Sequence, residues 1–370
     1  RGGTTYKALV VPGARLMPAD VLAKLLDLAK EGATVVFLDQ YPEDVPGYAG
    51  LERRRTEFKR ALEQIKKLGN ERGKDQTVFF GTDYARTLAQ TAAIPEAMKT
   101  SFDLSCIRRK NTEGYHYFIS ALTGKDTESW IPLAVPARSA MLYNPMNGAS
   151  GKALLRQKDG KTEVYLQLAS GESAILKTFT EADVQAPEWK YQTVAQGTVE
   201  LSGLWSLRFV ESAPAVHSVP DSVSLGSWTD LSFEGAGTTM GTGCYTTAFV
   251  IENPASAQDW LLSLGDVRES ARVRINGREV ATLWAVPYCC PIGQYLRPGK
   301  NILEIEVTNL PANRIADMDR RGVKWRIFKD INIAALGYKK GTYAGWEPVP
   351  SGLLGPVRII PLKITKNEMQ

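Results

Sequence analysis

Residues 264–310 decide the fold of this chain and read LGDVRESARVRINGREVATLWAVPYCCPIGQYLRPGKNILEIEVTNL. Two runs that alternate apolar and polar side chains flank Asn276 and Gly277. This pair is the strongest short-range signal for a β-hairpin, because a type I′ turn needs positive φ at both central residues. After a second turn, the run 302–307 alternates with period two, so its glutamates point outward and its aliphatic face is buried. The stretch therefore predicts half-buried antiparallel strands of a β-sandwich.

The composition and the charge of the chain argue against several classes of function. The chain has 44% apolar and 23% charged residues and a net charge of +5, which is typical of a folded globular protein. Its charges are spread along the sequence, so we expect neither nucleic acid nor a membrane as a partner. Two histidines almost exclude imidazole-based metal sites and triads, and the four cysteines lack metal-site spacing, which favours buried free thiols.

The length and the first residues bear on domain organisation. A chain of 370 residues predicts about two or three domains. It begins with Arg-Gly-Gly, without Met or a signal peptide, and enters a strand almost at once. We expect such a start from a cut inside a longer protein or from a processed N-terminus.

Residues 1–100 are typical of a small parallel α/β layer. Strands and helices alternate, and the second strand is a continuous apolar run, as expected when both faces of a parallel sheet are covered. No glycine-rich phosphate loop occurs, so we expect no nucleotide and no required cofactor. The predicted elements are strand 7–11, helix 18–30, strand 34–38, helix 51–68 and strand 77–80.

The rest of the chain is typical of all-β structure. Residues 101–182 hold short period-two runs separated by turns, which predict a small antiparallel β-sandwich. Residues 183–195 are predicted to be a linker, and residues 196–370 a larger β-sandwich domain that contains the opening stretch.

Five motifs in a fixed order carry a resemblance to a known family. They are Gly241–Tyr245, GDVRESARVRINGREV, TLWAVPY, LRPGKNILEIEVTN and Ser351–Val357. In this order they resemble the galactose-binding-like, sugar-binding jelly roll of many glycoside hydrolases. The nearest likeness is to the C-terminal part of α-L-rhamnosidase-like enzymes of glycoside hydrolase family 106, with family 2 more distant. The α/β layer resembles the flavodoxin- or amidotransferase-like layer of such enzymes, but its turn at 80–84 lacks the amidotransferase cysteine, so a structural role is expected.

The resemblance implies a role for the chain as part of a larger enzyme. In the resembled hydrolases the catalytic acid and base lie on an (α/β)-barrel that precedes the portion seen here. This chain has no run of eight strand–helix units, so the resemblance implies a non-catalytic part that supports the catalytic barrel of its parent chain. It also implies carbohydrate as a partner and an extracytoplasmic location, periplasmic or secreted, in a polysaccharide-degrading bacterium.

Carboxylate pairs are the first chemical candidates, because glycoside hydrolysis uses two carboxyls about 5–9.5 Å apart. Asp266 and Glu269 form the best local pair in the jelly roll. They lie beside Arg268 and Arg272, where a solvated ion-pair network is the simpler interpretation. Asp317-Met-Asp319 is a weak hint of a structural calcium ion.

Sugar binding uses aromatic faces and planar polar side chains. Trp284 and Tyr288 follow the hairpin, and the other candidates lie in or beside a long polar connection, 311–340, where binding residues concentrate. The alternative is that these side chains cap the core and solvate the loop. A stand-alone carbohydrate-binding protein, a structural module without ligand and a self-contained glycosidase stay open as well. The remaining candidates are Asn309, Asn313, Arg314, Trp325 and Arg326.

Overall fold

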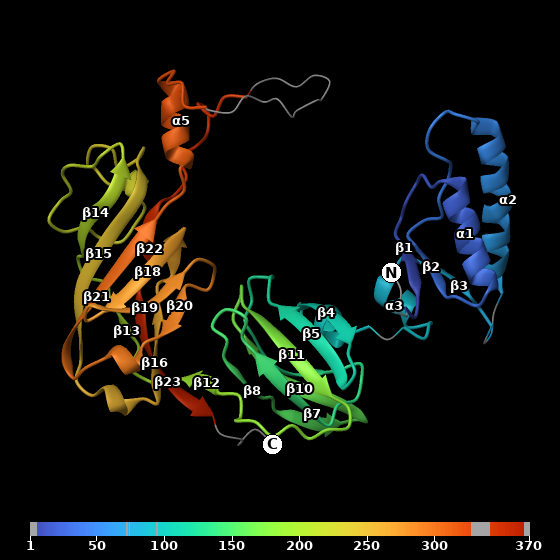
Figure 1. Ribbon diagram of the computed structural model, residues 1–370, viewed down its shortest axis with the longest axis horizontal. Helices are drawn as coiled ribbons and strands as arrows, with labels where there is room; N and C mark the ends of the chain where they lie inside the picture. Colours follow the sequence, from blue (N-terminus) through green and yellow to red (C-terminus); the bar gives the residue numbers. More distant parts are fainter. Residues whose placement is uncertain (1–5, 72, 74, 94, 327–340, 366–370) are drawn as a thin grey trace. The chain divides into compact units, whose positions relative to one another are not determined.

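The computed structural model describes residues 6–71, 73, 75–93, 95–326 and 341–365. It combines a small parallel α/β sheet near the N-terminus with several antiparallel sheets, as predicted (Figure 1). Contacts within the chain define two compact units. The first holds residues 1–106, 130–138 and 155–165, and the second holds residues 107–129, 139–154 and 166–370. The predicted domain boundaries stay a prediction.

The α/β layer of the first unit has the predicted parallel pairing. Its strands are β1 (Leu9–Val11), β2 (Val35–Leu38) and β3 (Val78–Gly81), in the order β1-β2-β3. The helices α1 (Ala19–Lys30) and α2 (Leu51–Asn70) bury their apolar sides in one core on the same face of the sheet (Figure 1). Two short helices, α3 (Tyr84–Leu88) and α4 (Ala97–Ser101), follow. On the opposite face, Val36 and Phe79 are covered by Leu88 of α3.

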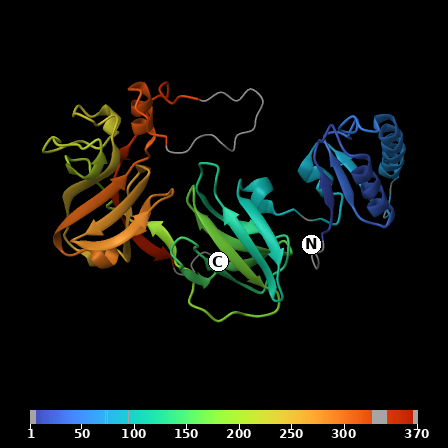
Figure 2. The same ribbon diagram turned by 45° about the horizontal axis from the view of Figure 1, so that its top comes forward.

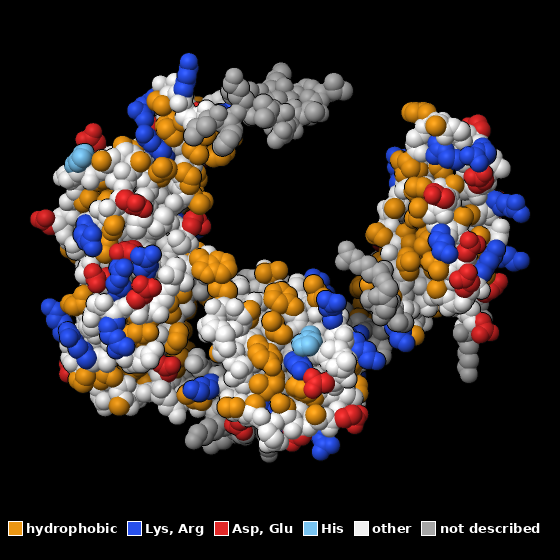
Figure 3. Space-filling view, in the orientation of Figure 1, with side chains coloured by type: hydrophobic (Ala, Val, Ile, Leu, Met, Phe, Trp, Pro, Cys, Tyr) orange, Lys and Arg blue, Asp and Glu red, His pale blue; other side chains and the backbone are white. Residues whose placement is uncertain are grey.

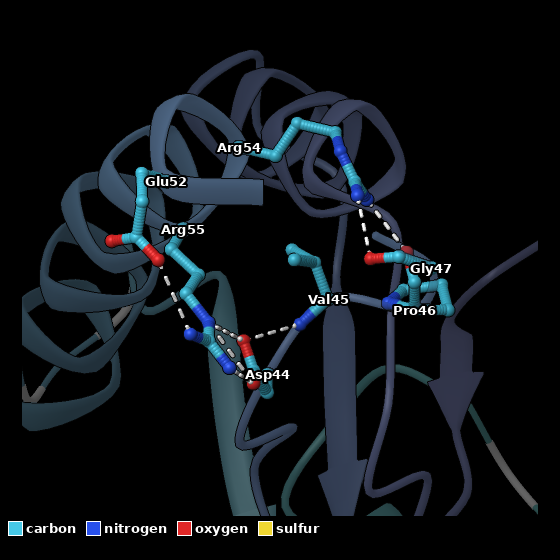
Figure 4. Close-up of polar contacts among 7 residues, drawn as sticks. All are labelled: Asp44, Val45, Pro46, Gly47, Glu52, Arg54 and Arg55. Atoms are coloured by element: carbon cyan, nitrogen blue, oxygen red, sulfur yellow. Dashed lines mark hydrogen bonds and ion pairs between the residues drawn. The ribbon is translucent and has the colours of Figure 1, made fainter. Parts of the chain in front are cut away.

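Two arginines of α2 fix the loop 39–50 that leaves strand β2 (Figure 4). The Arg54 guanidinium donates to the carbonyl oxygens of Pro46, Gly47 and Ala49 at 2.6, 2.7 and 2.8 Å. The neighbouring Arg55 pairs with the Asp44 carboxylate at 2.6 Å. The loop is therefore held to the helix through both its backbone and the Asp44 side chain.

The middle of the chain forms two more sheets. One has the order β4-β5-β11-β7-β8 and the other β6-β10-β9. The sequence did not indicate β7, because its run Ser-Ala-Met-Leu-Tyr is nearly all buried and does not alternate. The strands are β4 (Ser105–Lys110), β5 (Gly114–Ser120), β6 (Thr127–Pro132), β7 (Ser139–Tyr143), β8 (Ser150–Lys152), β9 (Leu155–Lys158), β10 (Lys161–Leu168) and β11 (Ser173–Phe179).

The C-terminal part of the second unit is a two-sheet sandwich (Figures 1 and 2). One sheet has the order β14-β15-β21-β18-β19 and the other β12-β23-β16-β20, with β13 beside β23 and a separate pair β17-β22. Both sheets contribute to one apolar core. The strands are β12 (Tyr191–Val194), β13 (Val199–Glu200), β14 (Ser206–Ala213), β15 (Met240–Ile251), β16 (Asp259–Ser263), β17 (Asp266–Arg268), β18 (Ser270–Ile275), β19 (Arg278–Leu283), β20 (Cys289–Pro291), β21 (Gly299–Thr308), β22 (Gly352–Gly355) and β23 (Arg358–Thr365). Three one-turn 3₁₀ helices complete it, η1 (Trp228–Asp230), η2 (Pro254–Ser256) and η3 (Gly293–Tyr295).

The opening stretch folds as predicted. Strands β18 and β19 form the hairpin, and the turn residues Asn276 and Gly277 have φ values of 53° and 77°. In β21 the alternating residues Leu303, Ile305 and Val307 are fully buried. The hairpin and β21 lie in the same sheet, because β21 pairs with β18 and β15.

The long connection 311–340 differs from the prediction of an irregular loop. It begins with helix α5 (Ala312–Arg320), which buries Asn313 and Ala316 on one side. The helix went unpredicted because its buried side holds one apolar residue, Ala316, beside the polar Asn313, among many charged residues. Residues 327–340 lie outside the described residues. No described helix is both long and apolar enough to span a membrane.

Candidate carbohydrate-binding site

A buried hydrogen-bond network builds the end of the sandwich where β22 lies. The Tyr245 hydroxyl accepts from the Trp228 indole N–H at 2.5 Å and from the Leu353 backbone N–H at 3.2 Å. A Cβ at Gly352 would collide with both aromatic side chains, so only glycine fits there. These hydrogen bonds connect η1 to strands β15 and β22.

Next to this network, Ser351 connects two buried asparagines. Its hydroxyl accepts from the side-chain amides of Asn309 and Asn313 at 3.2 and 3.3 Å. Asn309 also accepts from the Gly241 N–H, and Asn313 is bonded to both backbone groups of Val349. Both asparagines are buried, and their amide groups are engaged within the chain. In the structure they brace the loop before β22.

Helix α5 begins a segment that we call the α5 arm, residues 312–326 and 341–346. Asp317 pairs with Arg314 at 3.0 Å and with Arg321 at 2.7 Å. Asp319 accepts from the Tyr343 N–H at 2.7 Å and from the Trp325 indole at 2.6 Å. These hydrogen bonds hold the pKa of Asp319 below its usual value, and the bond from the Tyr343 backbone has the largest effect.

The aromatic side chains of the α5 arm are packed on one another. The Arg326 guanidinium lies 5.2 Å from the Trp325 ring centre and 5.1 Å from that of Tyr343. The Tyr343 ring is 4.5 Å from Trp346, which is 47% exposed. Asp319 and Arg326 therefore hold Trp325 and Tyr343 in place, and Tyr343 packs against the half-exposed Trp346.

An open surface depression is lined in part by residues that follow the α5 arm in the sequence. Its volume is about 550 Å³. It is shallow and of mixed polarity, and Pro348 and Pro350 of its wall follow Trp346 closely along the chain. Its lining residues are Gly226, Ser227, Thr229, Asp230, Pro348, Pro350 and Leu354.

The second group of candidates lies on the loop between β19 and β20. Trp284 is 64% exposed and Val286 60% exposed. Tyr288, at the end of this loop, is buried, and its hydroxyl donates to the Glu269 carbonyl at 2.6 Å. The Leu264 N–H donates to the Tyr288 carbonyl at 2.9 Å. The loop is thus anchored at its base while Trp284 faces solvent.

The carboxylate candidates are placed beside this loop. Asp266 forms an ion pair with Arg268 at 2.7 Å, and the charges of Asp266, Arg268 and Glu269 act on the Tyr288 hydroxyl. The ion pair agrees with the simpler interpretation of these charges. Burial, the largest cause, raises the pKa of Tyr288.

Acidic and cysteine side chains are the remaining candidates for metal or thiol chemistry among the described residues. Among them, no group of three His, Cys, Asp or Glu side chains is placed to hold a metal ion. The Asp317 carboxylate is engaged by arginines, and a calcium site stays a prediction. None of the four cysteines is in a disulfide, and burial raises the pKa of Cys290 to about 12, so its thiol is protonated at neutral pH.

The predicted binding residues therefore fall into two groups. One group gathers at α5, and it comprises Asn309, Asn313, Arg314, Trp325 and Arg326. The other is the loop of Trp284 and Tyr288, of which Tyr288 lies near Asp266 and Glu269. Sequence reasoning named Ser351 only within a family motif and Asp319 only as a hint of calcium, and it missed that these two residues hold the first group together. An acidic residue before a tryptophan and a serine before a glycine-rich strand are too common to signal such a role.

The comparisons with known proteins find a family likeness in the N-terminal part of the chain. Residues 1–157 match the family model described as α-L-rhamnosidase, glycoside hydrolase family 106. A protein of Formosa agariphila named β-glucuronidase is 31% identical over 179 residues, which cover 44% of this chain and 15% of that protein. The expected likeness to family 106 is confirmed for residues 1–157.

Solved structures extend the likeness at the level of the fold. A rhamnosidase from Novosphingobium sp. PP1Y has a TM-score of 0.57 and 23% identity, covering 96% of this chain and 33% of the rhamnosidase. A β-D-glucuronidase of Dictyoglomus thermophilum has a TM-score of 0.31 and 20% identity, covering 46% of this chain and 29% of its own. Residues 1–157 are thus related in sequence to α-L-rhamnosidases of glycoside hydrolase family 106, and the chain shares the fold of about a third of the Novosphingobium enzyme.

Proposed function

We propose that this chain is a non-catalytic part of an α-L-rhamnosidase-like glycoside hydrolase, and that its jelly roll binds carbohydrate. The family match and the shared fold support the class of the parent protein. In this proposal the catalytic carboxylates belong to a barrel outside this chain, and the substrate is an oligo- or polysaccharide. An extracytoplasmic location is part of the same proposal.

The observation that carries the proposal is the exposure of Trp284 on an anchored loop. Trp205, Trp228 and Trp260 of the same domain are buried in its core, as hydrophobic burial favours. Trp284 is 64% exposed although its loop is fixed by Tyr288. An indole face held toward solvent can stack on the C–H face of a sugar ring, and the neighbouring charged side chains can bond hydroxyl groups.

The test compares Trp284→Ala with the unchanged chain on a glycan array, followed by titration calorimetry with the glycans that bind. We expect binding by the unchanged chain and a loss of at least about tenfold in affinity in the variant, which is the scale of a central aromatic contact. Its thermal unfolding should stay the same, because the side chain contributes little to the core.

Tyr48→Ala is the matched control, since Tyr48 is an aromatic side chain that is 92% exposed on the α/β layer. This variant should bind like the unchanged chain. Equal affinity in Trp284→Ala and Tyr48→Ala would show that the jelly-roll loop is not the sugar site.

A supporting role is the second candidate function. The face of the β1-β2-β3 sheet opposite α1 and α2 is covered only in part, and Val10 and Leu38 on it are half-buried. Apolar side chains left partly open on a parallel sheet favour a further covering element. In this alternative no glycan binds the chain, and its task is to brace a catalytic barrel.

A further inference from the structure

The α5 arm carries a concentration of positive charge that the proposed function does not use. Residues 312–326 contain five basic side chains and two acidic ones, in a chain whose net charge is only +5. Figure 3 shows Lys and Arg side chains gathered over helix α5. The basic residues are Arg314, Arg320, Arg321, Lys324 and Arg326.

The two acidic residues of this segment are already engaged. Asp317 is paired with Arg314 and Arg321, and Asp319 accepts from Trp325, Thr342 and Tyr343. Arg320 and Lys324 are exposed, and within the described part of the chain no carboxylate lies within ion-pair distance of either. Their charges therefore remain available to a ligand.

The aromatic part of the arm is joined to these charges through Asp319, which precedes Arg320 and accepts from the Trp325 indole and the Tyr343 N–H. Arg326 lies over Trp325 and Tyr343, and Tyr343 packs against the half-exposed Trp346. A flat apolar face suits the C–H surface of a sugar ring, whereas nearby cations suit a carboxylate or a sulfate ester. A neutral sugar would use only the first of these features.

We propose that the α5 arm binds anionic polysaccharide, with Trp346 stacking on a sugar ring and Arg320 and Lys324 pairing with its acidic groups. The chemical class is a glycan that bears carboxylates or sulfate esters. For the class of ligand the inference rests on the proposed carbohydrate-binding function, but it uses a different surface from Trp284.

The experiment measures binding of the full chain to three probes by titration calorimetry: oligogalacturonate, a dextran sulfate oligosaccharide and neutral dextran. We expect one of the anionic probes to bind and neutral dextran to bind at least about tenfold more weakly. Binding should weaken as the salt concentration rises from roughly 0.05 to 0.5 M, because exposed charges are screened over that range. Comparison of the two anionic probes tells carboxylate from sulfate.

Two variants locate the site. Arg320→Glu with Lys324→Glu is expected to raise the Kd for the anionic probe about tenfold, and Trp346→Ala about fivefold. Lys24→Glu with Arg60→Glu, an exposed pair on α1 and α2, makes the same change in net charge and should leave the Kd nearly unchanged. Thermal unfolding of every variant checks that it folds.

The outcomes separate this inference from the proposed function. Equal binding of poly-L-glutamate, which has no sugar rings, would overturn the inference, and so would equal effects of the two charge-reversal pairs. If only Trp284→Ala loses glycan binding, the proposed function stands and the α5 arm is not an anionic-glycan site. If only the arm variants lose binding, the α5 arm is the binding site and Trp284 is not.

Discussion

Tyr245 connects three segments of the jelly roll through one hydroxyl group. It lies on β15 and accepts from Trp228 of η1 and from the backbone of Leu353 on β22. All three residues are fully or nearly fully buried. Because a buried N–H without a partner costs about 1–3 kcal/mol, the hydroxyl matters more for the two donors that it satisfies than for its own bond.

Replacement of Tyr245 by Phe removes this acceptor and keeps the ring. We expect the free energy of unfolding to fall by about 2–4 kcal/mol, since two buried donors lose their partner. Urea denaturation at neutral pH measures the change. Tyr48→Phe, at an exposed position, is the control and should leave the midpoint unchanged. An unchanged midpoint in Tyr245→Phe would show that the network contributes no stability.

The same residue predicts a pH dependence. Burial, the largest cause, raises the pKa of Tyr245 to about 12, whereas an unfolded tyrosine ionises near 10. Its stabilising contribution is complete below about pH 10 and is lost as the pH rises through about 12. Between these pH values the free energy of unfolding should fall with pH in both proteins. The slope in the unchanged chain should be steeper than that in Tyr245→Phe by about 1.4 kcal/mol per pH unit. Parallel curves for both proteins would contradict this account.

At the scale of elements, helix α2 shows how a charged helix orders a loop. The Arg54 guanidinium donates to three backbone carbonyl oxygens, a geometry that matches its planar set of donors, and Figure 4 shows the two bonds to Pro46 and Gly47. The pKa of Asp44 is lowered to about 2, mainly by the hydrogen bonds from Arg55 and next by the one from the Val45 N–H. The Asp44 contribution is therefore present above about pH 4 and is lost as the pH falls through about 2.

Arg54→Lys is expected to loosen this loop, because an ammonium group cannot reach all three carbonyl oxygens. We expect amide exchange at residues 44–50 to quicken about tenfold, the effect of losing one or two hydrogen bonds. Hydrogen-exchange mass spectrometry measures it. Arg53→Lys is the control, because among the described residues Arg53 makes only an exposed pair, with Glu57 at 3.4 Å. Unchanged exchange in Arg54→Lys would mean that the loop is ordered by other contacts.

The elements also show what could be predicted from sequence. The hairpin at Asn276 and Gly277 was predictable, because backbone sterics leave few residues able to take that turn. The same holds for α1, whose apolar residues recur at helical spacing. Strand β7 and helix α5 were not, since one is buried on both faces and the other has a short apolar side. Their identity depends on tertiary packing rather than on a local pattern.

At the scale of the whole molecule, the candidate site was predictable only in part. Aromatic and polar residues near the hairpin and after β21 were indicated by their type and by their position in loops. Their division into two surfaces was not, because it depends on contacts such as those of Ser351 and Asp319, which join residues far apart in the chain. Asn309 and Asn313 illustrate the difference, since their amides are engaged in bracing.

The central claim is that this chain binds carbohydrate but does not cleave it. The most direct measurement incubates the chain with p-nitrophenyl α-L-rhamnoside, and with each glycan that binds it, and records released nitrophenol and reducing ends. The account predicts binding by the chain and no release above a protein-free control, because Asp266 is paired with Arg268 and, in the proposed function, the hydrolytic carboxylates belong to a barrel outside this chain. Turnover that disappears in Asp266→Asn or Glu269→Gln would contradict it.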